Sequence, residues 1–253
     1  MSDTIILECN GASAAITLNI PAKHNRLGPA ELMRLMQCLD QVAGDAQIRC
    51  LVITGAGERS FCAGFDIGAI DSAKEASGPG FEALVDRIET MPMPVVAALN
   101  GGVFGGATDL ALACDFRLGV TGMRLFVPPA KLGLHYYPNG LRRFVERLGP
   151  GVAKRMFLLA EEFDAEELMR VGYLDWLVAP DRLRPRCAEL VENLVGMAPL
   201  ALRGMKRAIN QIARGTLDTA ATRAAIAEAY ASQDLQEGLA AHREKRKPIF
   251  QGR

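Results

Sequence analysis

Short apolar stretches at the start of the chain follow the pattern of β-strands. Residues 4–8 and 15–20 are rich in apolar and β-branched side chains, and Asn10-Gly11 lies between them. Asn-Gly is a favoured pair in tight hairpin turns because both residues tolerate positive φ angles. The sequence therefore predicts a β-hairpin over residues 4–20.

The segments that follow alternate between helical spacing and short apolar runs. Leu32, Leu35, Met36 and Leu39 recur with the period of an α-helix over residues 29–42. Strands are predicted at residues 50–54, 95–99 and 116–120, and helices at residues 81–89 and from the end of a loop over residues 100–106 to Ala113. The repeated order of strand, loop, helix and strand indicates a layered α/β fold in which loops after strands carry the chemistry.

From residue 139 onward the pattern is mainly helical. Asp164 with Glu167 three residues later is typical of a helix N-cap. Three helices are predicted near the end, over residues 198–214, 217–232 and 234–243, and Pro248 follows the last one. We predict a core domain over residues 1–197 and a helical region over residues 198–253. No low-complexity linker joins them, so we expect the helical region to pack against a partner surface.

Composition narrows the possible partners. Lys+Arg and Asp+Glu both number 29, and 49% of the residues are hydrophobic. This balance gives no indication of a nucleic-acid or membrane partner. No signal peptide and no run long enough to span a membrane is evident, and the six cysteines lack metal-binding spacing. We therefore expect a cytoplasmic protein with reduced, packed cysteines and no metal.

Two other segments have open interpretations. Residues 72–80 are small and polar, and we expect a mobile surface loop there. The basic run at residues 243–247 suits either a solvated helix end or a phosphate contact.

Two glycine-containing loops carry the candidate chemistry. The first covers residues 61–67, and the second covers residues 100–109 and opens a helix. Glycine lets a backbone approach a ligand closely, and the first amides of a helix are unpaired. Two such loops, if they converge, form an oxyanion site from backbone N–H groups. Each loop alone is more often an ordinary turn.

The two motifs F-C-A-G-F-D-I and N-G-G-V-F-G-G-A-T-D, at this separation, resemble the signature of the crotonase (enoyl-CoA hydratase/isomerase) superfamily. The resemblance extends over nearly the whole chain, from residues 21–27 to residues 245–250. It implies an α/β fold built as a spiral of ββα units. It also implies a helical C-terminal region that forms trimers, often paired into hexamers, and an acyl-CoA thioester substrate.

Site residues also follow from the resemblance. The amides of Phe65 and Gly106 are implied to form the oxyanion hole around the thioester oxygen. The remaining residues implied to contact coenzyme A, which is part of the substrate and not a separate cofactor, are Lys23, Asn25, Ala63, Asp66, Ile67, Lys247 and Phe250. Asp66 alternatively caps the next helix. Lys247 and Phe250 are expected to approach from a neighbouring subunit.

The chain departs from the two-glutamate pattern of the family's hydratases. Asp109 occupies the first glutamate position and Pro129 the second. Proline has no acid–base function, so efficient hydration by two acids is not expected. Asp109 is either the single acid–base group or a buried, hydrogen-bonded acid without a catalytic role.

A partial resemblance to methylmalonyl-CoA decarboxylase rests on Tyr136, which follows His135. Decarboxylation needs an oxyanion hole and a proton donor, and either side chain is a candidate donor. Phe65 and Asp109 differ from that decarboxylase, and Tyr136 and Tyr137 have packing as an alternative role.

Three hypotheses follow in order. The first is a hydratase/isomerase-type enzyme with Asp109 as its single acid–base group. The second is a malonyl-type decarboxylase, and the third is a CoA-thioester binding protein without catalysis.

Overall fold

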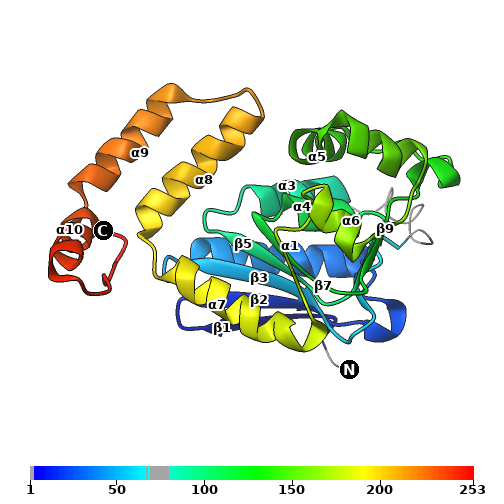
Figure 1. Ribbon diagram of the computed structural model, residues 1–253, viewed down its shortest axis with the longest axis horizontal. Helices are drawn as coiled ribbons and strands as arrows, with labels where there is room; N and C mark the ends of the chain where they lie inside the picture. The colour runs from blue at the N-terminus through cyan, green and yellow to red at the C-terminus, as the bar shows by residue number, and fades with distance from the viewer. Residues whose placement is uncertain (1–2, 67, 69–79) are drawn as a thin grey trace.

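The computed structural model describes residues 3–66, 68 and 80–253 (Figure 1). Its main sheet has six strands in the order β1-β2-β3-β5-β7-β10. Their bounds are Ile5–Asn10, Ser13–Leu18, Cys50–Gly55, Val95–Leu99, Phe116–Val120 and Trp176–Val178. β1 and β2 pair antiparallel and the other neighbours pair in parallel, so the predicted hairpin is confirmed.

Burial along the strands explains their positions in the sheet. In β2 the side chains alternate between buried and half-buried, which is the pattern of a strand with one face on the core. All five residues of β5 are buried, because this central strand has covered faces on both sides. Figure 1 shows α1 (Pro29–Gly44), α3 (Phe81–Glu89) and α4 (Ala107–Ala113) on one face and α7 (Leu183–Val195) on the other.

A second, four-stranded sheet has the order β4-β6-β8-β9. Its strands are Ser60–Cys62, Gly102–Phe104, Arg124–Phe126 and Phe163–Asp164. The interpretation of residues 61–66 and 100–106 as loops alone was therefore wrong in part. These strands have two or three residues each, which is too short for a readable alternation.

Two more helices complete the core. α5 (Pro138–Leu158) is interrupted at Gly149. Asp164 is the N-cap of α6 (Ala165–Arg170), and its carboxylate accepts a hydrogen bond from the Glu167 N–H. The predicted cap is therefore confirmed. The expected loop over residues 72–80 lies, except for Gly80, outside the described residues.

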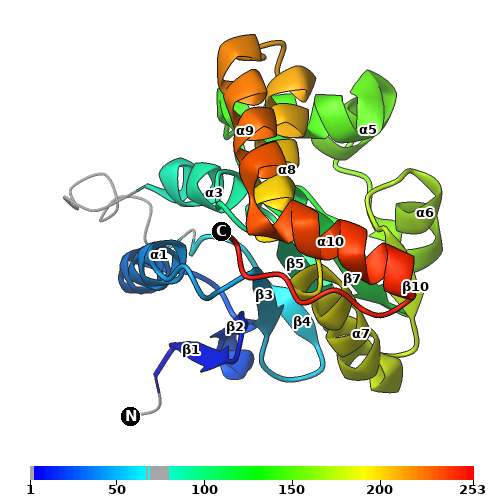
Figure 2. The same ribbon diagram turned by 90° about the vertical axis from the view of Figure 1, so that its left-hand side faces the viewer.

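The last three helices stand to one side of the sheet (Figures 1 and 2). They are α8 (Pro199–Ala213), α9 (Thr219–Ala231) and α10 (Gln233–Glu244). Lys206 on α8 ties them to the core through Asp115 at 2.6 Å and the Met93 carbonyl at 2.9 Å. The proposed boundary at residue 198 falls just before α8.

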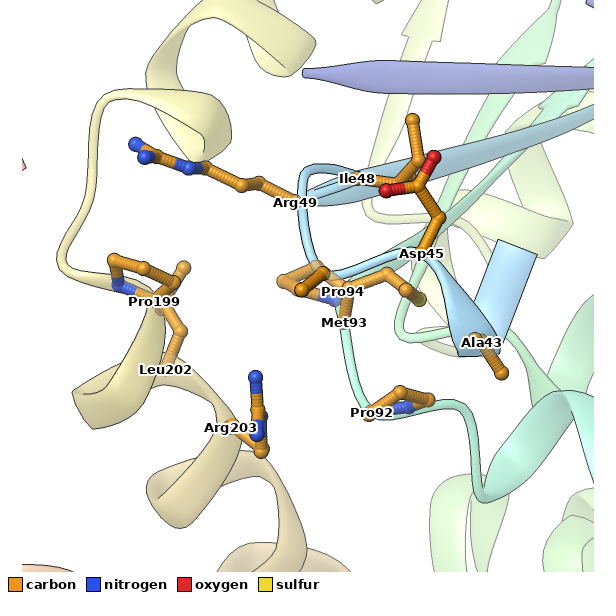
Figure 3. A pocket seen from close by; sticks show the side chains of 12 residues that line it. Ala43, Asp45, Ile48, Arg49, Pro92, Met93, Pro94, Pro199, Leu202 and Arg203 are labelled. Carbon is orange, nitrogen blue, oxygen red and sulfur yellow. The ribbon is translucent and has the colours of Figure 1, made fainter. Parts of the chain in front are cut away.

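A cavity of about 180 Å³ lies between the start of α8 and the core. In Figure 3, Arg49 and Arg203 extend from opposite sides of it, and Pro92 and Pro94 line its inner wall. None of its lining residues belongs to either glycine loop. This cavity therefore lies between the helical region and the core, and it is not part of the place where the two glycine loops meet.

Within the described part of the chain, no helix combines the length and the apolar character needed to cross a membrane. The same residues contain no group of three or more His, Cys, Asp or Glu side chains arranged to hold a metal ion.

Thiol reactivity tests the packing of the core. Burial raises the pKa of the Cys50, Cys62 and Cys114 thiols to about 12 and that of Cys187 to about 11, whereas Cys9 is exposed. Because the thiolate is the reactive form, a disulfide reagent at pH 8 is expected to label one thiol quickly in the folded protein. All six should react in denaturant. Rapid labelling of three or more thiols without denaturant would contradict this packing.

Candidate active site

The first glycine loop turns away from β4 beside Leu27. The Leu27 N–H donates to the Gly64 carbonyl at 2.9 Å, and the Asp66 N–H donates to the Leu27 carbonyl at 2.8 Å. In this parallel bridge Leu27 uses the residues on either side of Phe65. The N–H of Phe65 itself therefore points away from Leu27.

The second loop leads from β6 into α4. The Gly105 N–H donates to the Phe126 carbonyl at 2.9 Å, which anchors the loop to β8. Gly106 follows with helical backbone angles and immediately precedes α4. Asp109 lies three residues further, about one helical turn from Gly106.

The two loops meet at Gly64 and Gly106. A Cβ atom on Gly64 would lie 2.7 Å from the Gly106 nitrogen and 2.7 Å from the Phe104 carbonyl oxygen, and its φ angle is +83°. Only glycine fits such an approach. Among the described residues, no protein acceptor bonds the N–H of Phe65 or of Gly106. Gly64, which directly precedes Phe65, thus lies against the nitrogen of Gly106, so the two loops meet close to both of these N–H groups.

Aromatic rings cover this point. A Cβ atom on Gly106 would lie 2.7 Å from the Phe81 ring. The Phe81 ring centroid is 6.3 Å from that of Phe65 and 6.5 Å from that of Tyr137, both in edge-to-face geometry. These three rings form an apolar wall beside the amides, which suits an acyl chain.

Asp109 lies behind this wall in a closed ion pair. Its side chain has 0% exposure, as does that of Arg143. Arg143 Nε donates to Oδ1 at 2.8 Å and Nη2 donates to Oδ2 at 2.8 Å, a bidentate pairing. The hydroxyl of Tyr137 also donates to Oδ2. Asp109 is therefore a buried acid whose two carboxylate oxygens both accept hydrogen bonds from side chains, and its own surface is closed to solvent.

The ion pair continues toward α3 and α8. Arg143 Nη1 donates to Asp86 at 2.8 Å and to Glu89 at 2.9 Å. Burial opposes ionisation of Glu89, but the hydrogen bond from Arg142 and the charges of Arg143 and Arg214 hold its pKa below the usual value. Arg214, just after α8, lies 2.6 Å from Glu89. One buried network thus joins the site to the C-terminal helices.

Comparisons with known proteins agree with this architecture. The sequence model described as "Enoyl-CoA hydratase/isomerase" matches residues 8–253. The chain belongs to the enoyl-CoA hydratase/isomerase family. It is 31% identical over 251 residues to a short-chain-enoyl-CoA hydratase of Clostridium acetobutylicum, covering 97% of this chain and 96% of that protein. It is 33% identical over 254 residues to a crotonyl-CoA hydratase of Syntrophomonas wolfei, covering 98% of each.

A solved structure shows the same fold. The chain matches an enoyl-CoA hydratase/carnithine racemase from Magnetospirillum magneticum with a TM-score of 0.92 and 28% identity, over 100% of this chain and 97% of that one. The expected crotonase-type α/β fold is confirmed, and so is a helical region at the C-terminus.

Three of the residues expected to contact CoA, which are Lys23, Asn25 and Ala63, differ in how accessible their side chains are. Lys23 is exposed, and Ala63 is half-buried beside the second loop, with its carbonyl oxygen 3.6 Å from where a Cβ on Gly105 would lie. Asn25 is different, because its buried amide accepts from the Ile20 N–H and donates to the Ala56 and Ser60 carbonyls. Its side chain therefore shapes the loop and is not free to line a CoA path.

Asp66 and Ile67, which follow Phe65, are also among the residues expected to contact CoA. Asp66 pairs with Arg26 at 3.1 Å and accepts from the Gly68 N–H at 3.1 Å, and the residues that a cap at Asp66 would precede lie largely outside the described part of the chain. Ile67 lies outside the described residues.

Lys247 and Phe250 belong to the C-terminal segment, which Figure 2 shows running alongside α10. The Lys247 side chain is 95% exposed and lies 3.8 Å from Glu192. Phe250 packs near Gly238 and lines an apolar cavity with Leu235. Among the described residues, neither side chain makes a hydrogen bond or ion pair with the two loops.

Tyr136 and His135 are not placed as proton donors by their contacts. The Tyr136 hydroxyl is buried, has no hydrogen-bond partner among the described residues, and its pKa is raised by burial. The His135 ring is exposed and its Nδ1 lies 2.7 Å from the Tyr136 carbonyl oxygen. Pro129 begins a short 3-10 helix and supplies no acid.

Sequence reasoning missed Arg143, Phe81 and the role of Tyr137. The sequence did carry one indication of Arg143, because it lies three residues after Gly140 and directly before Phe144. The structure shows that all three residues are buried. An arginine on the apolar face of a helix indicates a buried acidic partner. The partner itself could not be identified without the fold.

The network makes a prediction for stability. Glu89→Gln removes a charge that faces three arginines and is expected to lower the free energy of unfolding by about 3 kcal/mol at pH 7. Because folding lowers the pKa of Glu89, its contribution is complete above its unfolded value of about 4.3 and is lost as the pH falls through the lower folded value. Urea unfolding at pH 7 and pH 3 should show the difference between the proteins shrinking at low pH. A difference that grows at pH 3 would contradict it.

Proposed function

We propose that this family member stabilises the enolate of an acyl-CoA thioester between the amides of Phe65 and Gly106. The observation that carries the proposal is the close approach of Gly64 to the Gly106 nitrogen, together with the lack of an acceptor for the Phe65 and Gly106 N–H groups among the described residues. Negative charge develops on the thioester oxygen as the enolate forms, and fixed donors in a dry site stabilise it strongly. Only main-chain groups are needed, so the phenylalanine at position 65 is compatible with this role.

We infer further that the reaction uses one acid–base unit. The named relatives are hydratases of short acyl-CoA thioesters, which supports an enoyl-CoA as substrate. Pro129 leaves the second acid position empty of acid–base chemistry, and Asp109 with Tyr137 is the unit next to Gly106. Movement of a double bond needs one group that takes a proton and returns it elsewhere. Isomerisation of an enoyl-CoA is therefore the first candidate, and hydration the second.

Decarboxylation receives less support from the site. That hypothesis needs Tyr136 or His135 as proton donor. The Tyr136 hydroxyl is buried, and Nδ1 of the His135 ring lies against the Tyr136 carbonyl oxygen. A catalytically silent thioester-binding protein is the third alternative and is an outcome of the test below.

The exposed apolar side chains of the last helices support an assembly. Large apolar residues on α8 and α9 are 51–71% exposed in the single chain, and these are Met205, Ile209, Ile212, Ile226 and Tyr230. Such a patch is unusual on a monomer and is typical of an interface. We infer that copies of this chain cover it in a trimer or hexamer, which also provides the neighbouring subunit that Lys247 and Phe250 would need to reach CoA.

The oxyanion hole can be tested with a matched pair of variants. Gly106 has φ −60°, which proline also adopts, so Gly106→Pro removes the N–H without changing the backbone angle. Gly106→Ala meets the same Phe81 ring and keeps the N–H. On a 3-enoyl-CoA, the proline variant is expected to show a kcat roughly 100-fold or more below the alanine variant.

The same assay is extended to crotonyl-CoA and methylmalonyl-CoA, with products followed by mass. Equal rates for the two Gly106 variants would contradict the oxyanion hole. Release of CO2 from methylmalonyl-CoA would favour the decarboxylase. Binding without turnover of any thioester would leave the silent binding protein.

A further inference from the structure

The Tyr137 hydroxyl links the buried ion pair to the wall beside Gly106. It donates to Asp109 Oδ2, while its ring meets the Phe81 ring that lies against Gly106. Tyr137 is half-buried, whereas Asp109 and Arg143 have no exposed surface. Tyr137 is thus the member of this group that lies at the boundary between the network and the acyl wall.

Asp109 has no route of its own to an acyl group. Oδ1 accepts from Arg143 Nε, and Oδ2 accepts from Arg143 Nη2 and from Tyr137. A proton that moves between Asp109 and a ligand must therefore pass through the Tyr137 oxygen. Because the Tyr137 hydroxyl donates its proton to Asp109, its oxygen keeps lone pairs that can accept another hydrogen, and the Tyr136 hydroxyl lies near it as a competing partner.

Arg143 stabilises the charged form of the Asp109 carboxylate. A lone carboxylate without exposed surface carries a large desolvation penalty, and a bidentate guanidinium offsets it. Arg143 is itself balanced by Asp86 and Glu89 at 2.8 and 2.9 Å, so it is held in one orientation. Its described hydrogen bonds go to the side chains of Asp109, Asp86 and Glu89 and not to the amides of Phe65 or Gly106, so its action on a ligand is indirect.

We propose that Tyr137 is the catalytic acid–base residue of the proposed isomerisation and that Arg143 is a positioning residue that keeps Asp109 charged behind it. This inference rests on the proposed function. It differs from the sequence-based expectation, in which Asp109 acts directly and Tyr136, not Tyr137, is the tyrosine named as a candidate proton donor.

The proton balance of the step is closed. The α C–H bond of the 3-enoyl thioester breaks, and its proton goes to Tyr137 Oη as the original Tyr137 proton passes to Asp109 Oδ2. The electron pair moves to the thioester oxygen, where Phe65 and Gly106 hold the dienolate. The reverse transfer places a proton on the γ-carbon, which yields the 2-enoyl thioester and restores both side chains.

Tyr137→Phe tests the catalytic role, since it removes the hydroxyl and keeps the ring against Phe81. On a 3-enoyl-CoA, kcat is expected to fall by roughly 100-fold or more, with KM within about threefold of the wild type. Tyr173→Phe is the matched control, because its buried hydroxyl donates to the Thr108 carbonyl on the same helix, α4, but takes no part in the proton path. Its kcat should stay at the wild-type level.

Arg143→Lys tests the positioning role. Lysine keeps the charge but lacks the planar fork that pairs with both oxygens of Asp109, so kcat should fall, but less than for Tyr137→Phe. Arg143→Gln, which removes the charge, should fall further while KM changes little. Circular dichroism and the thermal midpoint report separately whether each variant is folded. Folded Arg143→Gln protein with wild-type kcat would overturn this part.

Failure of the inference is distinguishable from failure of the proposed function. If the wild-type chain isomerises the thioester and Tyr137→Phe retains its kcat, Tyr137 is not the acid–base residue, although the function stands. If Tyr136→Phe loses activity instead, the proton passes through Tyr136 and the proposal is overturned. If the wild-type chain turns over no enoyl-CoA, both fail together.

Discussion

The site depends on the contact of two backbones at Gly64 and Gly106. The absent side chain of Gly64 leaves room for the Gly106 nitrogen, which would lie only 2.7 Å from a Cβ atom there. β4 and β6 pair in parallel, so the loops that follow them leave the second sheet at the same edge. The pairing of these two strands thereby holds the contact between Gly64 and Gly106. A larger residue at position 64 would push the two loops apart, and with them the two amides of the proposed oxyanion hole.

The buried ion pairs around Arg143 are separate from the contact between Gly64 and Gly106. Arg143 faces Asp109, Asp86 and Glu89, and Glu89 in turn faces Arg142 and Arg214. Ion pairs of this kind add little net stability compared with apolar packing, but breaking one of them is costly. The network therefore fixes positions more than it stabilises the fold. It also joins the helix after the second loop to the residue that follows α8, which makes the C-terminal region part of the frame of the site.

Much of the fold could be predicted from the sequence because its periods are long enough to read. The hairpin, α3 and β5 were each predicted within two residues, and the Asp164 cap was correct. The strands of the second sheet could not be predicted, since two or three residues carry no period. They became visible only through their pairing across the chain.

The candidate site divides in the same way. The two glycine loops were identified because a close approach between two backbones requires glycine, and the glycines themselves are visible in the sequence. The partners of Asp109 were not, because Arg143 lies 34 residues away and only the packing of α5 on α4 brings it close. The same limit explains why Asn25 was assigned to CoA, although its amide is used by three main-chain groups. A side chain's role depends on what surrounds it, and short motifs do not contain that information.

The central claim is that the amides of Phe65 and Gly106 hold a thioester oxygen, and the carbonyl band of a bound thioester tests it most directly. Isotope-edited infrared difference spectra of butyryl-CoA carrying a ¹³C=O label would isolate that band on binding to the wild-type chain. The account predicts a shift to lower frequency, because two hydrogen bonds polarise the carbonyl. A band at the frequency of the free thioester, under conditions in which the ligand is fully bound, would contradict the account.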